Sequence, residues 1–177
     1  MALPKIDTPS YQLELPSNQQ VVKYRPFLVR EQKILMMAQE AENKEDTYNM
    51  LSDIVGGCTF NSIDIKTMPI FDFEYLFLKI RCKSVGETVE LSVLCPDDEK
   101  TRVPVTVNLD IVDVQVEDDH NNVIGVNDSI KIIMRHPTVG DIKSVDEAET
   151  LNNIMKLLKV CIHEIHDGDI IHSMIDV

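Results

Sequence analysis

The most apolar stretch of the chain is PIFDFEYLFLKIRCKSV, from Pro69 to Val85. Its aromatic and aliphatic residues match both helical spacing and strand alternation, so periodicity alone leaves both structures open. Pro69 and Asp72 are residue types that favour a helix start, and Gly86 favours a stop. We therefore predict a buried helix that ends before Gly86.

Upstream of this stretch, residues 11–27 predict a β-hairpin. Apolar and polar residues alternate from Tyr11 to Leu15, Pro16-Ser17-Asn18 supplies turn chemistry, and Val21–Tyr24 forms the return strand. Two helices should follow, with Ile34, Leu35 and Ala38 on the inner face of the first. The second runs from about Glu45 to Val55, and Gly56-Gly57 should end it, because glycine adopts the left-handed C-terminal conformation without steric cost.

Downstream of Gly86 the pattern changes to β structure. Val89, Leu91 and Val93 alternate with polar residues, Cys95 to Asp98 predicts a turn, and Val103–Leu109 returns. Pro104 lies in the return strand and cannot donate a ladder hydrogen bond, so that strand should lie at an edge or contain a bulge.

Between Val112 and Val177 the sequence predicts further strands, turns and one long helix. We expect a strand over Val112–Val116, a turn over Asp118–Asn122, a strand over Ile130–Met134 and a capping box from Thr138 to Asp141. A helix from about Asp146 to Ile162 should bury Leu151, Ile154, Leu158, Cys161 and Ile162. A short extended tail, His163–Val177, closes the chain.

These elements predict an α+β fold in one domain, residues 1–177. Its parts are an N-terminal arm and hairpin (1–27), a mainly helical segment (28–85), a β-rich segment with antiparallel strands (86–136), and a helix with a short extended tail (137–177).

The charge balance restricts the classes of partner. The chain has 17 lysines and arginines against 30 aspartates and glutamates, a formal net charge of -13. Such an acidic surface repels phosphate, which argues against nucleic acid and anionic membranes as partners and favours basic or neutral protein surfaces. We find no membrane-spanning stretch and no secretory signal at Met1–Pro9, so synthesis in a cytoplasm is expected.

Catalytic motifs are missing from the sequence. There is no glycine-rich phosphate loop and no nucleophile elbow, and acidic pairs are too frequent for any two to be singled out. The main alternative is a metal-dependent enzyme that uses His163, His166 and His172. The spacing of three between the first two histidines does not fit the zinc-protease pattern, and a strand before an Asp-Gly turn is favoured. Asp119–Gly125 lacks the ligand spacing of a calcium loop. We predict no cofactor and no metal.

The four cysteines, Cys58, Cys82, Cys95 and Cys161, lie far apart in the sequence. In a reducing cytoplasm we expect four free thiols, most of them buried. Cys95-Pro96 resembles half of a zinc knuckle, but a simple turn is favoured.

Two short segments are candidates for protein interfaces. The proline-rich arm contains Leu3, Pro4 and Ile6 and lies either on its own domain or on a neighbour. Tyr24, Arg25 and Phe27 lie at a strand-to-helix junction and are residue types common in interface cores, although packing within the domain is the alternative.

Several motifs, in this order, also resemble a known family. They are Leu3–Pro9, Tyr24–Val29, Glu31-x-Lys33-Ile34-Leu35, Phe73–Arg81, Lys83–Glu87 and Cys95-Pro96. Together they are similar to the baseplate hub subunit family of T-even-type contractile-tailed bacteriophages, over most of the chain. That family continues beyond the position of Val177 with an acidic helical segment.

The resemblance implies a structural or assembly role in the virion, at the hub of the viral tail baseplate, after assembly in the host cytoplasm. Other phage baseplate hub or tail proteins would be the partners, with a homo-oligomer as a further alternative, and no catalytic or metal-binding residue is implied. An acidic DNA mimic is disfavoured because the carboxylates are interspersed with core positions along the whole chain.

Overall fold

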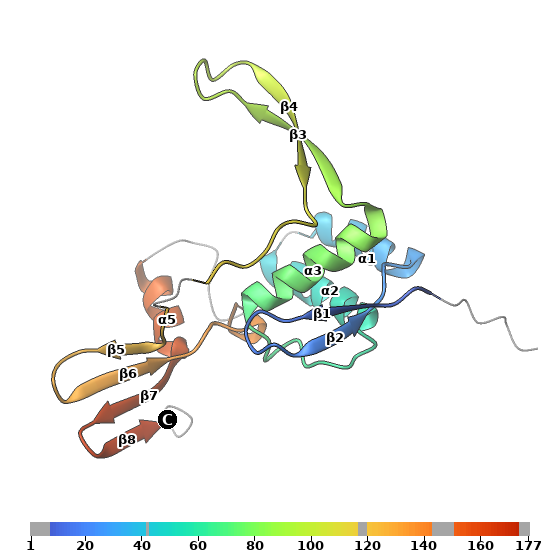
Figure 1. The fold of residues 1–177 in the computed structure, drawn as a ribbon. Coiled ribbons are helices and arrows are strands. Elements are labelled where there is room, and N and C mark those ends of the chain that lie inside the picture. The colour runs from blue at the N-terminus through green and yellow to red at the C-terminus, as the bar shows by residue number, and fades with distance from the viewer. Residues whose placement is uncertain (1–7, 42, 117–119, 143–150, 174–177) are drawn as a thin grey trace, which may run out of the picture.

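The structure is a computed structural model that describes residues 8–41, 43–116, 120–142 and 151–173. Helices and antiparallel sheets are both present, which confirms the predicted α+β class. Figure 1 shows a helical body with the N-terminal hairpin against it, a long hairpin that projects from this body, and a C-terminal sheet on another side. No helix in the described ranges is long and apolar enough to cross a membrane.

The N-terminal hairpin forms as predicted, from β1 (Tyr11–Glu14) and β2 (Val21–Tyr24), with Tyr11 opposite Tyr24. Its turn is tied to the helical body by a buried carboxylate. Asp72 accepts hydrogen bonds from the backbone N–H of Ser17, at 3.1 Å, and from the Ser17 hydroxyl. Hydrogen bonds to both oxygens of a buried carboxylate offset part of the cost of removing it from water.

Helix α1 spans Val29–Gln39 and α2 spans Lys44–Cys58. The α2 N-terminus is capped by Asn43, whose side chain accepts a hydrogen bond from the Asp46 N–H at 2.7 Å. The predicted stop at Gly56-Gly57 is wrong, since both glycines lie inside α2. Both have close neighbours there: a Cβ on Gly56 would lie 3.1 Å from Asn61 Oδ1, and one on Gly57 3.3 Å from Glu31 Oε1.

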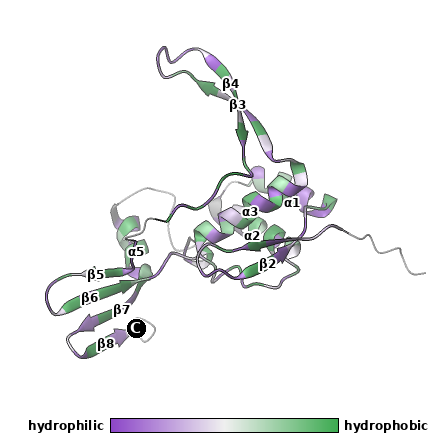
Figure 2. Cartoon of the chain, in the orientation of Figure 1, coloured by the Kyte–Doolittle hydropathy of each residue, from purple (hydrophilic) through white to green (hydrophobic). Residues whose placement is uncertain are grey.

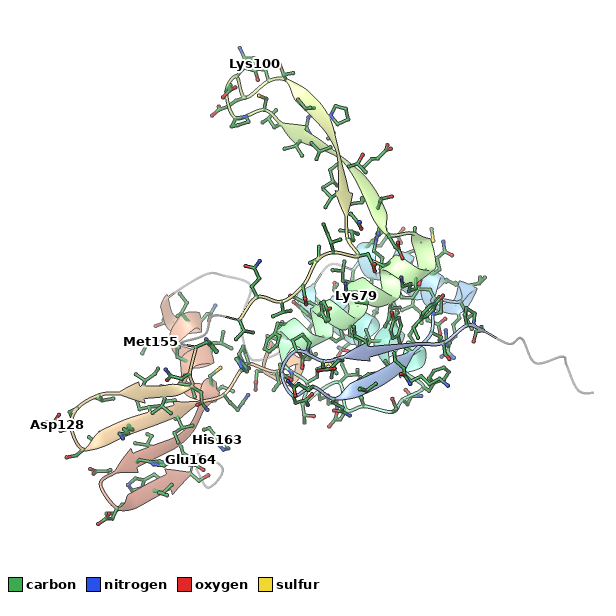
Figure 3. The ribbon with its side chains drawn as sticks, viewed as in Figure 1. Lys79, Lys100, Asp128, Met155, His163 and Glu164 are labelled. Carbon is green, nitrogen blue, oxygen red and sulfur yellow. The ribbon has the colours of Figure 1, made fainter. Side chains whose placement is uncertain are left out.

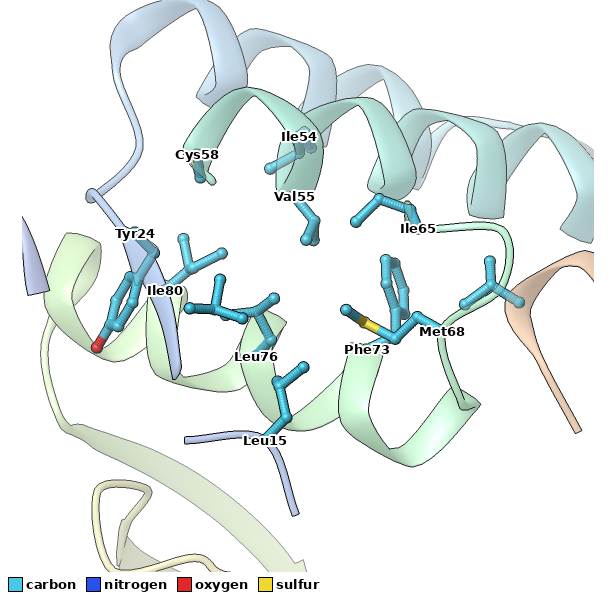
Figure 4. Close-up of a cluster of buried hydrophobic side chains, with 12 residues drawn as sticks. Leu15, Tyr24, Ile54, Val55, Cys58, Ile65, Met68, Phe73, Leu76 and Ile80 are labelled. Carbon is cyan, nitrogen blue, oxygen red and sulfur yellow. The ribbon is translucent and has the colours of Figure 1, made fainter. Parts of the chain in front are cut away.

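The apolar stretch forms helix α3, Ile70–Val85, as predicted, and Gly86 ends it with φ of 127°. A helix places Phe73, Leu76 and Ile80 on one face, and all three are buried. Burying such side chains contributes about 2 kcal/mol each. Figure 4 shows them facing α2 and the N-terminal hairpin.

The main hydrophobic core lies between these elements. Its buried members are Leu15, Val22, Tyr24, Ile54, Val55, Cys58, Ile65, Met68, Phe73, Leu76, Ile80 and Val139. All but Val139 come from residues 15–80, so the later strands contribute little to this core. One domain over residues 1–177 stays a prediction.

After α3 the chain forms the projecting hairpin, β3 (Thr88–Leu94) and β4 (Arg102–Asn108), as predicted. It is a separate two-stranded sheet, so Pro104 lies on an edge strand. The strand predicted at Val112–Val116 is wrong, because these residues pair with no other strand in the described ranges. The turn predicted at Asp118–Asn122 lies partly outside the described residues.

The C-terminal sheet has the strand order β5-β6-β7-β8, from β5 (Val123–Gly125), β6 (Ile130–Met134), β7 (Ile162–Asp167) and β8 (Ile170–Ser173). The strand predicted at Ile130–Met134 is thus confirmed. The predicted strand before an Asp-Gly turn is confirmed, because β7 ends at Asp167 and Gly168 has φ of 58° in the turn that follows. The tail predicted as a single extended segment from His163 thus consists of two paired strands, β7 and β8. Residues 174–177 of that prediction lie outside the described residues.

Two helices lie between β6 and β7 in the sequence, the short α4 (Val139–Ile142) and α5 (Leu151–Cys161). The start of α4 is bonded to the loop before α3, where the Val139 N–H donates to the Met68 carbonyl at 3.0 Å. The predicted cap of α4 is present, because the Asp141 carboxylate accepts the Thr138 N–H at 2.8 Å. Asp141 also forms an ion pair with Arg135, at 2.7 Å.

The prediction for α5 is partly wrong. Cys161 is buried, but Ile154 is 55% and Leu158 47% exposed, and Ile162 belongs to β7. The apolar stripe of α5 therefore lies largely on the surface of the described structure. The predicted start near Asp146 and the side chain of Leu151 lie outside the described residues.

Candidate functional site

The projecting hairpin is joined to the helical body by a buried lysine. Lys79, on α3, is 9% exposed, and its ammonium donates to the carbonyl oxygens of Asp110, at 2.6 Å, and Val112, at 3.1 Å. The same nitrogen lies 5.1 Å from the centre of the Tyr75 ring, within range of a cation–π interaction. Figure 3 shows Lys79 at the base of the hairpin and Lys100 at its tip.

A second lysine of α3 strengthens this base. Lys83 Nζ lies 2.5 Å from Glu87 Oε1 and 3.6 Å from Asp110 Oδ1. The hairpin ladder starts beside these groups, where the Leu109 N–H donates to the Glu87 carbonyl at 2.7 Å. Both strands are thus fixed to α3 at their base, which restricts the direction in which the hairpin projects.

One face of the hairpin is entirely apolar. The register places Val89 opposite Val107, Leu91 opposite Val105, and Val93 opposite Val103, and side chains of alternate residues share a face. Leu91, Val93, Val103 and Val105 are between 40% and 47% exposed. We call these six side chains the apolar ladder of the hairpin; the alternation is visible as green and purple segments in Figure 2.

The opposite face is mainly polar. It carries the pairs Thr88 with Asn108, Glu90 with Thr106, and Ser92 with Pro104, followed by Leu94 with Arg102. A strand with one apolar and one polar face is typical of a sheet that packs on something on one side only. No described element packs on the apolar side of this hairpin closely enough to bury it.

The tip of the hairpin is an ordered acidic turn. Asp98 accepts hydrogen bonds from the Thr101 hydroxyl and from the backbone N–H groups of Lys100, at 3.0 Å, and Thr101, at 2.9 Å. These bonds, that of the Thr101 hydroxyl first, lower the pKa of Asp98 to about 2. The predicted turn at Cys95–Asp98 is confirmed, and its geometry is held by the chain's own groups.

The histidines of the C-terminal strands do not converge. His166 Nε2 lies 3.0 Å from Glu164 Oε2, and His163 Nε2 lies 3.8 Å from Glu164 Oε1. His172 pairs with Ile165, so its side chain lies on the face opposite to that of Glu164 and His166. No group of three or more potential metal ligands occurs among the described residues.

A hollow of about 660 Å³ lies where the C-terminal sheet meets the loop before α3. His120 and His136 stack in it with ring centres 6.0 Å apart, and His163 also lines it. The His136 ring packs edge-on against Phe71, with 5.0 Å between centres. The arrangement of these aromatic rings is one of side-chain packing.

The predicted interface residues at the strand-to-helix junction make contacts within the chain. Tyr24 is buried in the core, and the Phe27 ring lies 6.0 Å from that of Phe77. Arg25 forms an ion pair with buried Glu31, with 3.0 Å between Nη2 and Oε1. These contacts match the alternative of packing within the domain, and an interface role for these residues stays a prediction. Leu3, Pro4 and Ile6 lie outside the described residues.

Hydrogen bonds keep the Glu31 carboxyl of the Arg25–Glu31 pair ionised, which is typical of a contact that stabilises the fold. Burial of Glu31 raises its carboxyl pKa, but hydrogen bonds from Arg25 and from the Leu28 N–H outweigh burial and lower the pKa overall. The Leu28 bond, at 2.9 Å, also satisfies a free N–H at the start of α1. An open hollow of about 640 Å³ beside the pair is lined by charges of both signs, including Arg30, Asp53 and Lys66.

All four cysteines are unpaired in the structure, and Cys58, Cys82 and Cys161 are buried, as expected. Burial raises the pKa of each of these three thiols, and that of Cys58 reaches about 11. Thiols with such pKa values are protonated at neutral pH and are poor nucleophiles. Cys95, at the hairpin tip, is only partly buried.

The described structure thus exposes apolar side chains on the β3–β4 hairpin and on α5. A family model described as T4 bacteriophage base plate protein matches residues 8–177. The chain belongs to this family. It is therefore a phage baseplate protein with a structural role in the virion tail, and it contacts other baseplate proteins. No curated protein and no solved structure matches it significantly.

Membership of this family agrees with the resemblance found in the sequence motifs of the baseplate protein. Two of those motifs lie at core and junction positions: Phe73 and Leu76 are buried, and Arg25 forms an ion pair with Glu31. The apolar ladder was visible in the sequence only as strand alternation. The sequence did not predict that the ladder is exposed. A strand shows the same alternation of apolar and polar residues whether or not another part of the chain covers its apolar face.

Proposed function

We propose that this baseplate protein is a structural or assembly component of the baseplate hub of a contractile tail. It acts through protein–protein contacts, is not an enzyme, and is assembled into the tail in the host cytoplasm. The observation that carries the proposal is the apolar ladder on a hairpin fixed by Lys79. A surface of this kind suits burial against another protein, since exposed contiguous apolar patches commonly mark interaction sites.

The assignment to the hub is supported by the ordered set of motifs from Leu3 to Cys95-Pro96. The net charge of -13 supports protein partners over nucleic acid. The family match supports a structural role over the metal-dependent enzyme, and so does the separation of His172 from Glu164 and His166.

The proposal is tested by locating the protein in baseplates from infected cells. Phage carrying an epitope-tagged copy are grown, tails and baseplate assembly intermediates are purified, and the protein is quantified by mass spectrometry and located by immuno-electron microscopy. We expect a fixed number of copies per particle, at the centre of the baseplate. Label at the periphery would contradict the hub assignment, and absence from both tails and intermediates would contradict the structural role.

A further inference from the structure

The outer part of the apolar ladder of the β3–β4 hairpin, Leu91, Val93, Val103 and Val105, is left exposed by the described elements, whereas Val89 and Val107 near the base are half-buried. A two-stranded hairpin is marginally stable in water when nothing covers its apolar face. Here four of the six ladder side chains are at least 40% exposed, although the base of the hairpin is fixed by Lys79 and Lys83. A partner that covers the ladder would meet a surface already held in place, which reduces the conformational entropy lost on binding.

The charge of the hairpin disfavours a second copy of the chain as this partner. Between Gly86 and Asp110 there are six acidic and two basic side chains. Glu90 near the base, and Asp97 and Glu99 at the tip, form no ion pair in the described structure. Two hairpins placed face to face would bring acidic groups together in either orientation, and the whole chain repels a second copy through its charge of -13.

The size of the ladder also disfavours two hairpins stacked flat on each other. Each strand has seven residues, so one face is roughly 24 Å long and 10 Å wide, about 240 Å². A stable interface buries about 800 Å² on each partner. A partner with a groove reaches that area by contacting the ladder together with the edges and the tip of the hairpin.

We propose that the β3–β4 hairpin inserts into an apolar groove of a different baseplate protein, and that lysines and arginines on the rim of this groove face Asp97 and Glu99. This inference rests on the proposed function, because it presumes that the protein is built into the baseplate. The ladder provides the apolar contact, the acidic tip selects a basic rim, and the lysines of α3 set the angle of entry.

The test uses a phage that lacks this gene and is complemented with variants of the full chain. In the first variant, Val93→Thr with Val105→Thr, two ladder side chains become polar while residues that favour β strands are retained. In the second, Asp97→Lys with Glu99→Lys, the charge of the tip is reversed. The matched control, Thr88→Ser with Thr106→Ser, alters the polar face of the same two strands.

The readout is the number of copies of the protein per purified baseplate, measured with isotope-labelled peptides. Circular dichroism and the melting temperature of each purified variant show whether it folds. We expect each of the first two variants to be incorporated about tenfold less than the control, the size of loss typical of a central interface position. Incorporation equal to that of the control would overturn the inference.

A second measurement does not depend on the folding of those variants. A photo-crosslinking amino acid replaces Leu91 in the complementing protein, and the crosslinked peptides are sequenced from purified baseplates. A crosslink to another tail protein, at a segment with lysine or arginine beside apolar residues, supports the inference. Crosslinks to a second copy, to the same chain or to no protein would each overturn it, while leaving the proposed function intact if the protein is present in the particles. Absence of the unmodified protein from tails and intermediates would overturn the proposed function itself.

Discussion

The ammonium nitrogen of Lys79 lies 2.6 Å from the backbone carbonyl oxygen of Asp110. A buried charge on α3 therefore holds the segment that follows β4, at the base of the projecting hairpin. The two residues are 31 positions apart in the sequence. A hydrogen bond from a charged donor to a backbone carbonyl is stronger than one between neutral groups. The same lysine also donates a hydrogen bond to the Val112 carbonyl. This contact is where the helical body and the candidate interface meet.

Replacing Lys79 should therefore loosen the hairpin. In Lys79→Met the apolar stem is retained, but the carbonyls of Asp110 and Val112 lose their donor. We expect the free energy of unfolding to fall by about 2 kcal/mol. Amide hydrogen exchange should accelerate over residues 102–112. The control Lys100→Met, at the exposed tip, should change neither quantity, and equal behaviour of the two variants would contradict the role of Lys79.

The Arg25–Glu31 pair provides a second stability prediction. In Glu31→Gln the guanidinium of Arg25 stays buried without its counter-charge, and we expect a loss of about 3 kcal/mol in the free energy of unfolding. Chemical denaturation measures this loss. The same exchange at exposed Glu14, on β1, should have an effect of less than about 0.5 kcal/mol. A small effect at Glu31 would show that water replaces the lost carboxylate.

The same pair predicts how stability changes with pH. In the folded chain Glu31 and Asp141 both have pKa values below their ordinary ones, because hydrogen bonds from Arg25 and Arg135 outweigh burial. Such carboxylates stabilise the fold at pH values above their unfolded pKa, and this contribution is lost as the pH falls through the folded pKa. The stability difference between the wild type and Glu31→Gln should be constant at neutral pH and shrink below pH 4.5, the ordinary glutamate pKa. A difference that widens in acid would contradict this account.

The adjacent glycines of α2 should respond in opposite directions to the same substitution. Alanine in a helix interior is favoured over glycine by about 1 kcal/mol. In Gly56→Ala the new methyl group meets the exposed side chain of Asn61, which can move away, so the protein should become more stable. In Gly57→Ala it meets the Glu31 carboxylate, which Arg25 and Leu28 hold in place, so stability should fall. Thermal unfolding of the two variants measures the contrast, and the same sign for both would refute it.

The thiols should differ in reactivity with an alkylating reagent at neutral pH. Cys58, fully buried and with a pKa of about 11, should react slowest in the native protein. Cys95 should react first because it is partly exposed at the hairpin tip. Mass spectrometry of labelled peptides over time gives the order, and Cys95→Ser should remove the fast phase. After unfolding in guanidinium, all four thiols of the wild type should react at similar rates.

Local sequence patterns were sufficient where the signal comes from neighbours along the chain. Helix α3 follows from its apolar spacing together with Pro69 and Gly86, and the β3–β4 hairpin follows from alternation around a turn. The same reasoning failed at Gly56-Gly57. There the glycines lie close to the side chains of Asn61 and Glu31 in the folded chain. Spacing patterns in the sequence do not predict such tertiary contacts.

The sequence by itself determined the class of the fold, the positions of the main helices and of both hairpins around α3, the acidic character of the surface and the family. Tertiary structure alone decided which apolar faces are covered. Phe73 and Val105 both belong to regular apolar patterns, yet the first is buried in the core and the second is 40% exposed on the ladder. Periodicity depends on the geometry of a single element, whereas burial depends on which distant segments pack against it.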